Sequence, residues 1–378
     1  MQKPTIMTWR FWSISGTLFS FIVIITSISS RVVDTSSYPV KLYQVDSGFS
    51  KLNYHTGIIW TLSYLGAMLP ADEPCIIYNH DSSIATIDFR AAGFNDSALA
   101  AIAAILDSVD HTIAPDTIDI ARLLVLLAYS SPHYYAITGA PKKFSHLKRV
   151  PIEMEKKLLL LKSSIAKGKR KLHYYINKWN DSYFIAEELD DSAQTMEFEV
   201  MDFLPNTQPR FMIYNKQGLL VSAANSAITS AGKPGKCMWC HESKAQPLFE
   251  TSTLTDVAQQ HFLNEIVKFN KDLYGYRRSL NTQVAFDQLQ AHTNSELLYI
   301  SFMQSSLQRI AGEWEVSKET AQERLAPFNS TYDEEFKWLG KAFERELIDS
   351  LCKRRTVRIT QNVREQNTFE PDYLNYMH

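Results

Sequence analysis

The sequence predicts an α+β fold that is mainly helical and contains a small antiparallel sheet. Apolar residues recur at helical spacing in most of the chain, whereas short runs typical of strands gather between residues 182 and 221. With 45% hydrophobic and 21% charged residues, the 378-residue chain has the composition of a folded globular protein. We therefore expect four segments, which are residues 1–30, 31–181, 182–252 and 253–378.

The first segment has the pattern of an export signal. Lys3 and Arg10 precede an apolar run from Phe11 to Ile28, and small residues follow it. This run of about 18 residues is also at the lower limit for crossing a bilayer, so we expect either a cleaved signal peptide or a membrane tether through residues 11–28. The protein is thus predicted to be exported, and to be periplasmic or anchored to the outer face of the cytoplasmic membrane.

Helices dominate the prediction for the second segment. The apolar run Gly57–Leu69 predicts a buried helix, and residues 75–88 predict two short strands. Two more helices are expected, one capped near Asn95 and one opened by Pro115, because these residue types favour helix starts. Residues 151–180 are interpreted as a long helix or a helix pair.

The third segment changes to the pattern of strands. Its small antiparallel sheet is predicted from four short runs, at residues 183–185, 198–201, 210–214 and 219–221. The sheet directly precedes a polar, Gly- and Pro-rich loop, residues 226–249, for which it would serve as a platform. The fourth segment is predicted to be helical from three apolar stripes: Phe262, Ile266, Phe269 and Leu273; Ile300, Met303, Leu307 and Ile310; Phe336, Leu339, Phe343 and Leu347.

The predicted loop carries the pattern Cys-x-x-Cys-His, as Cys237-Met238-Trp239-Cys240-His241. Two thiols at this spacing lie on one side of a tight turn, where each can form a thioether with a haem vinyl group. The histidine that follows can bind the iron. At these five residues the chain resembles the c-type cytochromes. The resemblance implies one covalent haem c, held by Cys237 and Cys240, with His241 as the proximal axial ligand.

The motif and the export signal together predict an exported mono-haem cytochrome-like protein in electron transfer. Its partner would be a redox protein or a small electron donor or acceptor. The formal charge of −2 gives no argument for a nucleic-acid partner. The alternative is a binding, structural or thiol-redox protein that uses Cys237 and Cys240 as a dithiol or a metal staple.

The sixth iron ligand is less defined than the proximal one. Met303 follows His241 at a separation that small cytochromes c also use, and His292 precedes a capping box on an interhelical loop. Met201 and Met212 are further thioethers on the predicted strands. An open sixth position would favour a ligand sensor or a peroxidase-like enzyme, so the sequence leaves open whether the protein is an enzyme.

Cationic side chains near the motif are expected to bind the haem propionates. Lys233, Lys236 and Arg210 are the candidates closest in sequence. The two remaining cysteines, Cys75 and Cys352, either pair as a disulfide in an oxidising compartment or stay as separate buried thiols.

Overall fold

A computed structural model describes most of the chain beyond the N-terminal segment. The described residues are 37–42, 53–79, 84–109, 117–147, 155–160, 163, 165–247, 257–288, 291–330 and 340–351. The chain divides into residues 1–33 and residues 34–378, and every described residue belongs to the second unit. The predicted export signal, Pro115 and Cys352 lie outside the described residues.

The fold is a mixed α+β fold, and the prediction of a mainly helical chain is wrong. Of the described residues, 41% are helical and 24% are in strands. The difference arises largely at residues 151–180, which hold strands β5 (Lys156–Leu160) and β6 (Arg170–Tyr175) where a helix was expected. The leucine-rich run of β5 also suits a helix. Pairing of β6 with a strand further along the chain decides the outcome, because strand preference depends on such neighbours.

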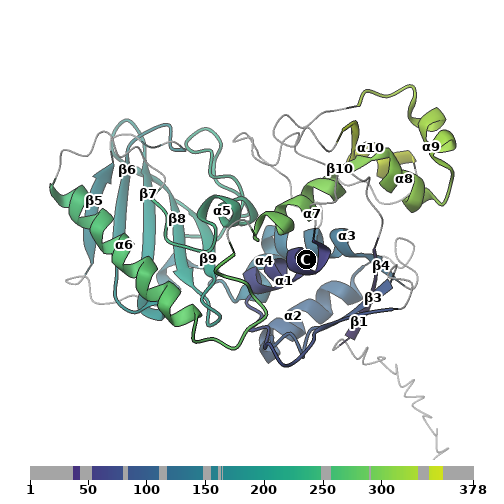
Figure 1. Cartoon of the computed structure of the whole chain (residues 1–378). Coiled ribbons are helices and arrows are strands. Elements are labelled where there is room, and N and C mark those ends of the chain that lie inside the picture. Colours follow the sequence, from purple (N-terminus) through teal and green to yellow (C-terminus); the bar gives the residue numbers. More distant parts are fainter. Residues whose placement is uncertain are drawn as a thin grey trace, which may run out of the picture. The chain divides into compact units, whose positions relative to one another are not determined.

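Strands β5 to β9 form a five-stranded antiparallel sheet in sequence order. The sheet continues with β7 (Tyr183–Leu189), β8 (Thr195–Phe203) and β9 (Pro209–Asn215), which confirms three of the four predicted strands. Residues 219–221 make only isolated bridges. Helix α6 (Val257–Arg277) runs along one face of this sheet (Figure 1). Its predicted stripe is buried there, with Phe262 against Tyr174 and Phe269 against Phe184 and Phe203.

A second group of helices packs with a four-stranded sheet of order β2-β3-β1-β4. Asn95 caps α2 through a bond from the Ala98 N–H, as predicted, whereas Asp119 caps α3. Helix α3 continues as a short π-helix, η2, whose Tyr129 points toward the motif. The elements are α1 (Tyr54–Tyr64), α2 (Asp96–Asp107), α3 (Ile120–Leu124), η2 (Val125–Tyr129), α4 (Ser131–Thr138), α7 (Thr293–Met303), β1 (Ser37–Lys41), β2 (Ile76–Tyr78), β3 (Ile84–Asp88) and β4 (Ile118–Asp119).

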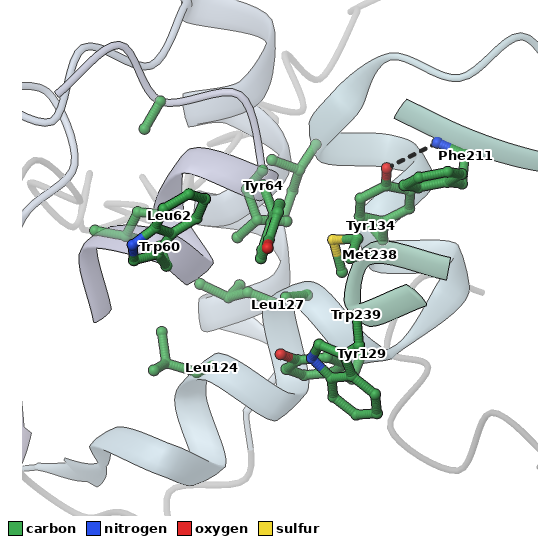
Figure 2. Close-up of a cluster of buried hydrophobic side chains, with 14 of the residues drawn as sticks. Trp60, Leu62, Tyr64, Leu124, Leu127, Tyr129, Tyr134, Phe211, Met238 and Trp239 are labelled. Atoms are coloured by element: carbon green, nitrogen blue, oxygen red, sulfur yellow. Dashed lines mark hydrogen bonds between the residues drawn. The ribbon is translucent and has the colours of Figure 1, made fainter. Parts of the chain in front are cut away.

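Buried hydrogen bonds join the five-stranded sheet to these helices. The Phe211 N–H donates to the Tyr134 hydroxyl at 3.1 Å, as drawn in Figure 2. Asn206, in the β8–β9 turn, donates through Nδ2 to the carbonyls of Ser63 and Ala67 at 2.6 and 2.8 Å. Both contacts lie near β9, so this edge of the sheet is covered by protein.

The C-terminal elements have a small core of their own. The predicted helix through Ile300 and Ile310 is interrupted, because strand β10 (Gln304–Ser306) separates α7 from α8 (Leu307–Trp314). Strand β10 pairs with β11 (Ala342–Glu344), and α9 (Lys318–Leu325) and α10 (Arg345–Leu351) complete the group. Two residues of the third predicted stripe, Phe336 and Leu339, lie outside the described part of the chain. Phe343 lies in β11 and Leu347 in α10, so the prediction of one helix through both is wrong.

Candidate functional site

The Cys-x-x-Cys-His motif forms a helix, α5 (Pro234–His241), in the middle of the predicted loop. Pro234 starts the helix, and Glu242 ends it in the left-handed conformation while its N–H bonds to the Met238 carbonyl. Residues three and four apart share one helix face. The two thiols and the imidazole therefore project to the same side, which is the arrangement that attachment of one planar group requires.

Helix α5 is held in place by its other face. Trp239 packs against Tyr129 and Tyr299, with ring centroids 5.2 Å apart in both pairs. Met238 is fully buried, close to Tyr134 (Figure 2). Gly235 allows the close approach, because a Cβ at this position would lie 2.5 Å from Cδ1 of Tyr129. The two residues between the cysteines thus anchor the helix, and the motif side chains face away from them.

All three motif residues line one cavity of about 460 Å³. The cavity lies between α5, α6 and the α6-facing side of the five-stranded sheet. Its volume is within the range of about 300–1,000 Å³ typical of small-molecule and cofactor sites. Most of its walls are apolar, formed by residues that include Phe184, Met201, Phe211, Phe262 and Ile266.

His241 is in the protonation state that binds metals. Burial lowers the pKa of its imidazole to about 4, and the nearby Arg170 charge adds to this effect. The ring is therefore neutral at neutral pH, as ligation requires. Its Nδ1 is buried and has no hydrogen-bond partner among the described residues, and the ring lies 5.2 Å from that of Phe211, centroid to centroid.

The thiol groups of the two motif cysteines lie in different surroundings. Cys237 is partly buried and Cys240 is exposed. Burial raises the pKa of the Cys237 thiol well above its ordinary value, and the charge of Glu199 raises it further. Reactive dithiols have lowered thiol pKa values, usually at helix N-termini or beside cations. The pKa of the Cys237 thiol is raised instead, although Arg170 is nearby, and this disfavours the thiol-redox alternative.

Arg170 and Glu199 bring charge to one wall of the cavity, and Glu188 and Glu197 lie beside them in the sheet. Arg170 on β6 donates through Nη2 to Glu188 on β7 and, at 3.1 Å, to Glu199 on β8. Glu197 lies opposite Glu188 in the β7–β8 register and accepts a bond from the Asn225 N–H at 2.9 Å. Burial, with a contribution from Glu199, raises the pKa of Glu188 to about 7 and that of Glu197 to about 8.

The three expected propionate partners differ in whether they line the cavity. Lys236 lines the cavity, and Lys233 is buried at the start of α5. Arg210 is paired with Asp202 through Nε at 2.8 Å, and its Nη1 donates to the Thr138 carbonyl at 3.0 Å. Arg210 is not among the cavity-lining residues.

The candidate sixth ligands lie in different parts of the structure. Met201 lines the cavity, whereas Met303 and His292 do not. Met212 borders the cavity, but it alternates with Phe211 on β9 and its sulfur lies 3.5 Å from the Tyr214 hydroxyl on the other face of the sheet. Met303 is buried in α7, and Nε2 of His292 lies 3.8 Å from Oε1 of Glu242. Within the described ranges, no group of three or more His, Cys, Asp or Glu residues has the arrangement of a metal site.

Sequence reasoning missed the charged wall. No role was predicted for Glu197 or Glu199, which lie beside and within the predicted strand at residues 198–201. Their alternation with Phe198 and Val200 puts both carboxylates on the same side of β8 as Met201. Two glutamates on the face that also carries apolar core residues were the available signal.

No protein family, curated protein or solved structure matches this chain. The described residues include no helix with the length and hydropathy needed to cross a bilayer.

Proposed function

We propose that this protein is an exported mono-haem c-type protein that transfers single electrons. Cys237 and Cys240 would hold the haem through thioethers, and His241 would bind the iron as proximal ligand. The observation that carries the proposal is that these three side chains line the same apolar cavity. The motif alone did not require a cavity beside it.

The surroundings of the motif fit such a group. A cavity of about 460 Å³ with largely apolar walls suits a large, flat, apolar molecule. His241 is neutral, so no proton has to be displaced from the imidazole before it ligates iron. Lys236, one of the three predicted propionate partners, and Arg170, which was not predicted, bring cations to the cavity wall.

When bound, a haem supplies a one-electron couple at its iron. The chain's own residues set the conditions for it. Apolar side chains on the sheet and α6 exclude water, and the neutral imidazole donates its lone pair. Cys240 is exposed, which leaves that edge of the site accessible to a redox protein or a small electron donor or acceptor.

The sixth position remains a proposal with several candidates. The thioether of Met201 is on the cavity wall in the present arrangement. Met303 or His292 would have to reach the cavity through rearrangement of α7 or of the segment before it. Export through residues 1–30, with residues 11–28 as a membrane tether if the signal is retained, belongs to the same proposal.

The direct test is expression of the full chain with haem-maturation machinery, followed by a pyridine haemochrome spectrum. One covalent haem per chain is expected. Cys237→Ser and Cys240→Ser should each remove one thioether, which shifts the haemochrome band. His241→Ala should keep the thioethers and shift the Soret band. Cys75→Ser, at a buried cysteine outside the cavity lining, is the matched control and should leave every band unchanged.

Two results of this experiment would contradict the proposed function. Wild-type protein without covalent haem, in which Cys237 and Cys240 titrate as free thiols, would overturn the proposal. Stoichiometric zinc in that protein would identify the motif as a metal staple.

A further inference from the structure

A buried cluster on the sheet contains more acidic groups than cations and reaches the cavity through Arg170 and Glu199. We define the wall cluster as Arg170, Glu188, Glu197 and Glu199, which comprises three carboxyl groups and one guanidinium on the same face of the sheet. Arg170, Glu188 and Glu197 are each less than 10% exposed, at 8%, 0% and 3%. Full ionisation would leave two uncompensated negative charges in a buried region, which is strongly unfavourable.

Buried carboxyl oxygens without a hydrogen-bond partner are the places where protonation would neutralise the excess negative charge. One carboxyl oxygen of each glutamate is buried without a hydrogen-bond partner in the described part of the chain, namely Oε2 of Glu188, Oε1 of Glu197 and Oε1 of Glu199. A proton on such an oxygen removes the charge and supplies a donor to neighbouring oxygens. Besides Arg170 and Glu199, the titratable or charged groups that line this cavity come from α5 and the residue after it, and they are Lys236, Cys237, Cys240, His241 and Glu242.

We propose that the wall cluster takes up a proton when the iron held by His241 is reduced, so that the protein transfers an electron and a proton together. This inference rests on the proposed haem function. The electron comes from the redox partner and lowers the iron by one oxidation state. The proton comes from solvent and bonds to a carboxylate oxygen of Glu197 or Glu188. Oxidation returns both, so charge and atoms balance in each direction.

The wall cluster is close enough to the motif for this coupling. Arg170 and Glu199 line the same cavity as His241 and Cys237, and Arg170 donates a hydrogen bond to Glu188. Reduction removes one positive charge from the cavity, which favours the protonated form of a nearby carboxyl group. The pKa values of about 7 and about 8 for Glu188 and Glu197 place this exchange near neutral pH.

The experiment is a spectroelectrochemical titration of the full haem-loaded chain at a series of pH values across the neutral range. The reduction potential should fall as pH rises, with a slope that approaches about 59 mV per pH unit, the value for one proton per electron. Glu197→Gln should flatten the slope near its pKa, and the redox difference infrared spectrum should lose the carboxylic acid C=O band. Glu188→Gln provides an independent second variant if the first does not fold.

Glu187→Gln is the matched control. Glu187 is adjacent to Glu188 on β7 but faces the other side of the sheet, where His173 and Lys171 bond to it. Although burial opposes ionisation, bonds from Thr195, His173 and Lys171 hold the pKa of Glu187 below its usual value. This variant should therefore keep the wild-type slope.

Covalent haem with a potential that does not change over the neutral range would overturn the proton coupling alone. A slope that survives in Glu197→Gln and in Glu188→Gln would also overturn it. Absence of covalent haem would overturn the proposed function and the coupling with it.

Discussion

Two buried charge clusters in this protein differ in their balance of acids and bases. The wall cluster (Arg170, Glu188, Glu197 and Glu199) has three carboxyl groups for one guanidinium and reaches the cavity through Arg170 and Glu199. The second, which we call the lock cluster, consists of Arg309, Arg345, Glu313 and Asp119 and pairs two guanidiniums with two carboxylates. In the lock cluster, Arg309 bonds Asp119 at 2.6 Å and Glu313 at 2.7 Å, and Arg345 bonds Glu313 at 2.6 Å.

The pKa values follow this difference. Although burial opposes ionisation, Arg345 and Arg309 hold the pKa of Glu313 well below its usual range. In the wall cluster, burial and mutual repulsion raise the pKa values of Glu188 and Glu197 to about 7 and about 8. The balanced cluster keeps its charges and joins β4 to α8 and α10. The carboxyl groups of Glu188 and Glu197 in the acid-rich cluster instead favour the protonated form, so the two clusters differ in whether their charges are balanced.

Glu313→Gln should have the largest effect on stability. It would leave Arg309 and Arg345 buried with one carboxylate, that of Asp119, and removal of one partner of a buried ion pair costs about 3–5 kcal/mol. Urea denaturation at neutral pH would measure the free energy of unfolding of this variant and of Glu197→Gln. A Glu313→Gln loss no greater than that of Glu197→Gln would contradict the assignment of the structural role to the lock cluster.

The pH dependence of stability should have opposite signs in the two clusters. Glu197 has a folded pKa raised from 4.5 to about 8, so its contribution to stability is present below 4.5 and is lost as pH rises toward 8. Glu313 has a lowered folded pKa, so its contribution is present above 4.5 and is lost as pH falls.

Glu197→Gln should therefore gain stability relative to wild type by about 1–3 kcal/mol between mildly acidic and mildly alkaline pH. Denaturation curves of both proteins at the two ends of this window provide the measurement. A constant difference between the two proteins across the window would show that Glu197 is ionised throughout.

The smallest effect is expected at an exposed ion pair. Glu315 lies 3.6 Å from Lys41, and its side chain is 79% exposed. Exposed pairs contribute about 0–1 kcal/mol, so Glu315→Gln should change the free energy of unfolding by less than about 0.5 kcal/mol. A loss of stability comparable to that of Glu313→Gln would mean that burial does not explain the difference between Glu313, in α8, and Glu315, just after it.

Local sequence signals determined much of the secondary structure. The Asn95 cap and the stripe through Phe262 and Ile266 predicted α2 and the buried face of α6, because both depend on residues within a few positions of each other. The residue composition also predicted three strands of the large sheet. The spacing of Cys237, Cys240 and His241 identified the candidate cofactor chemistry, since that pattern lies within five residues.

What only the tertiary structure decided depends on partners distant in the sequence. Strands β5 and β6 form because β7 pairs with β6, and a leucine-rich run does not predict this contact. The motif forms helix α5, and Tyr129 packs against the buried face of that helix. The register of β6, β7 and β8 gathers the wall cluster, and α5 and α6 enclose the cavity beside it. Pattern and propensity act over a few residues, whereas burial, charge balance and protonation depend on which distant residues the fold brings together.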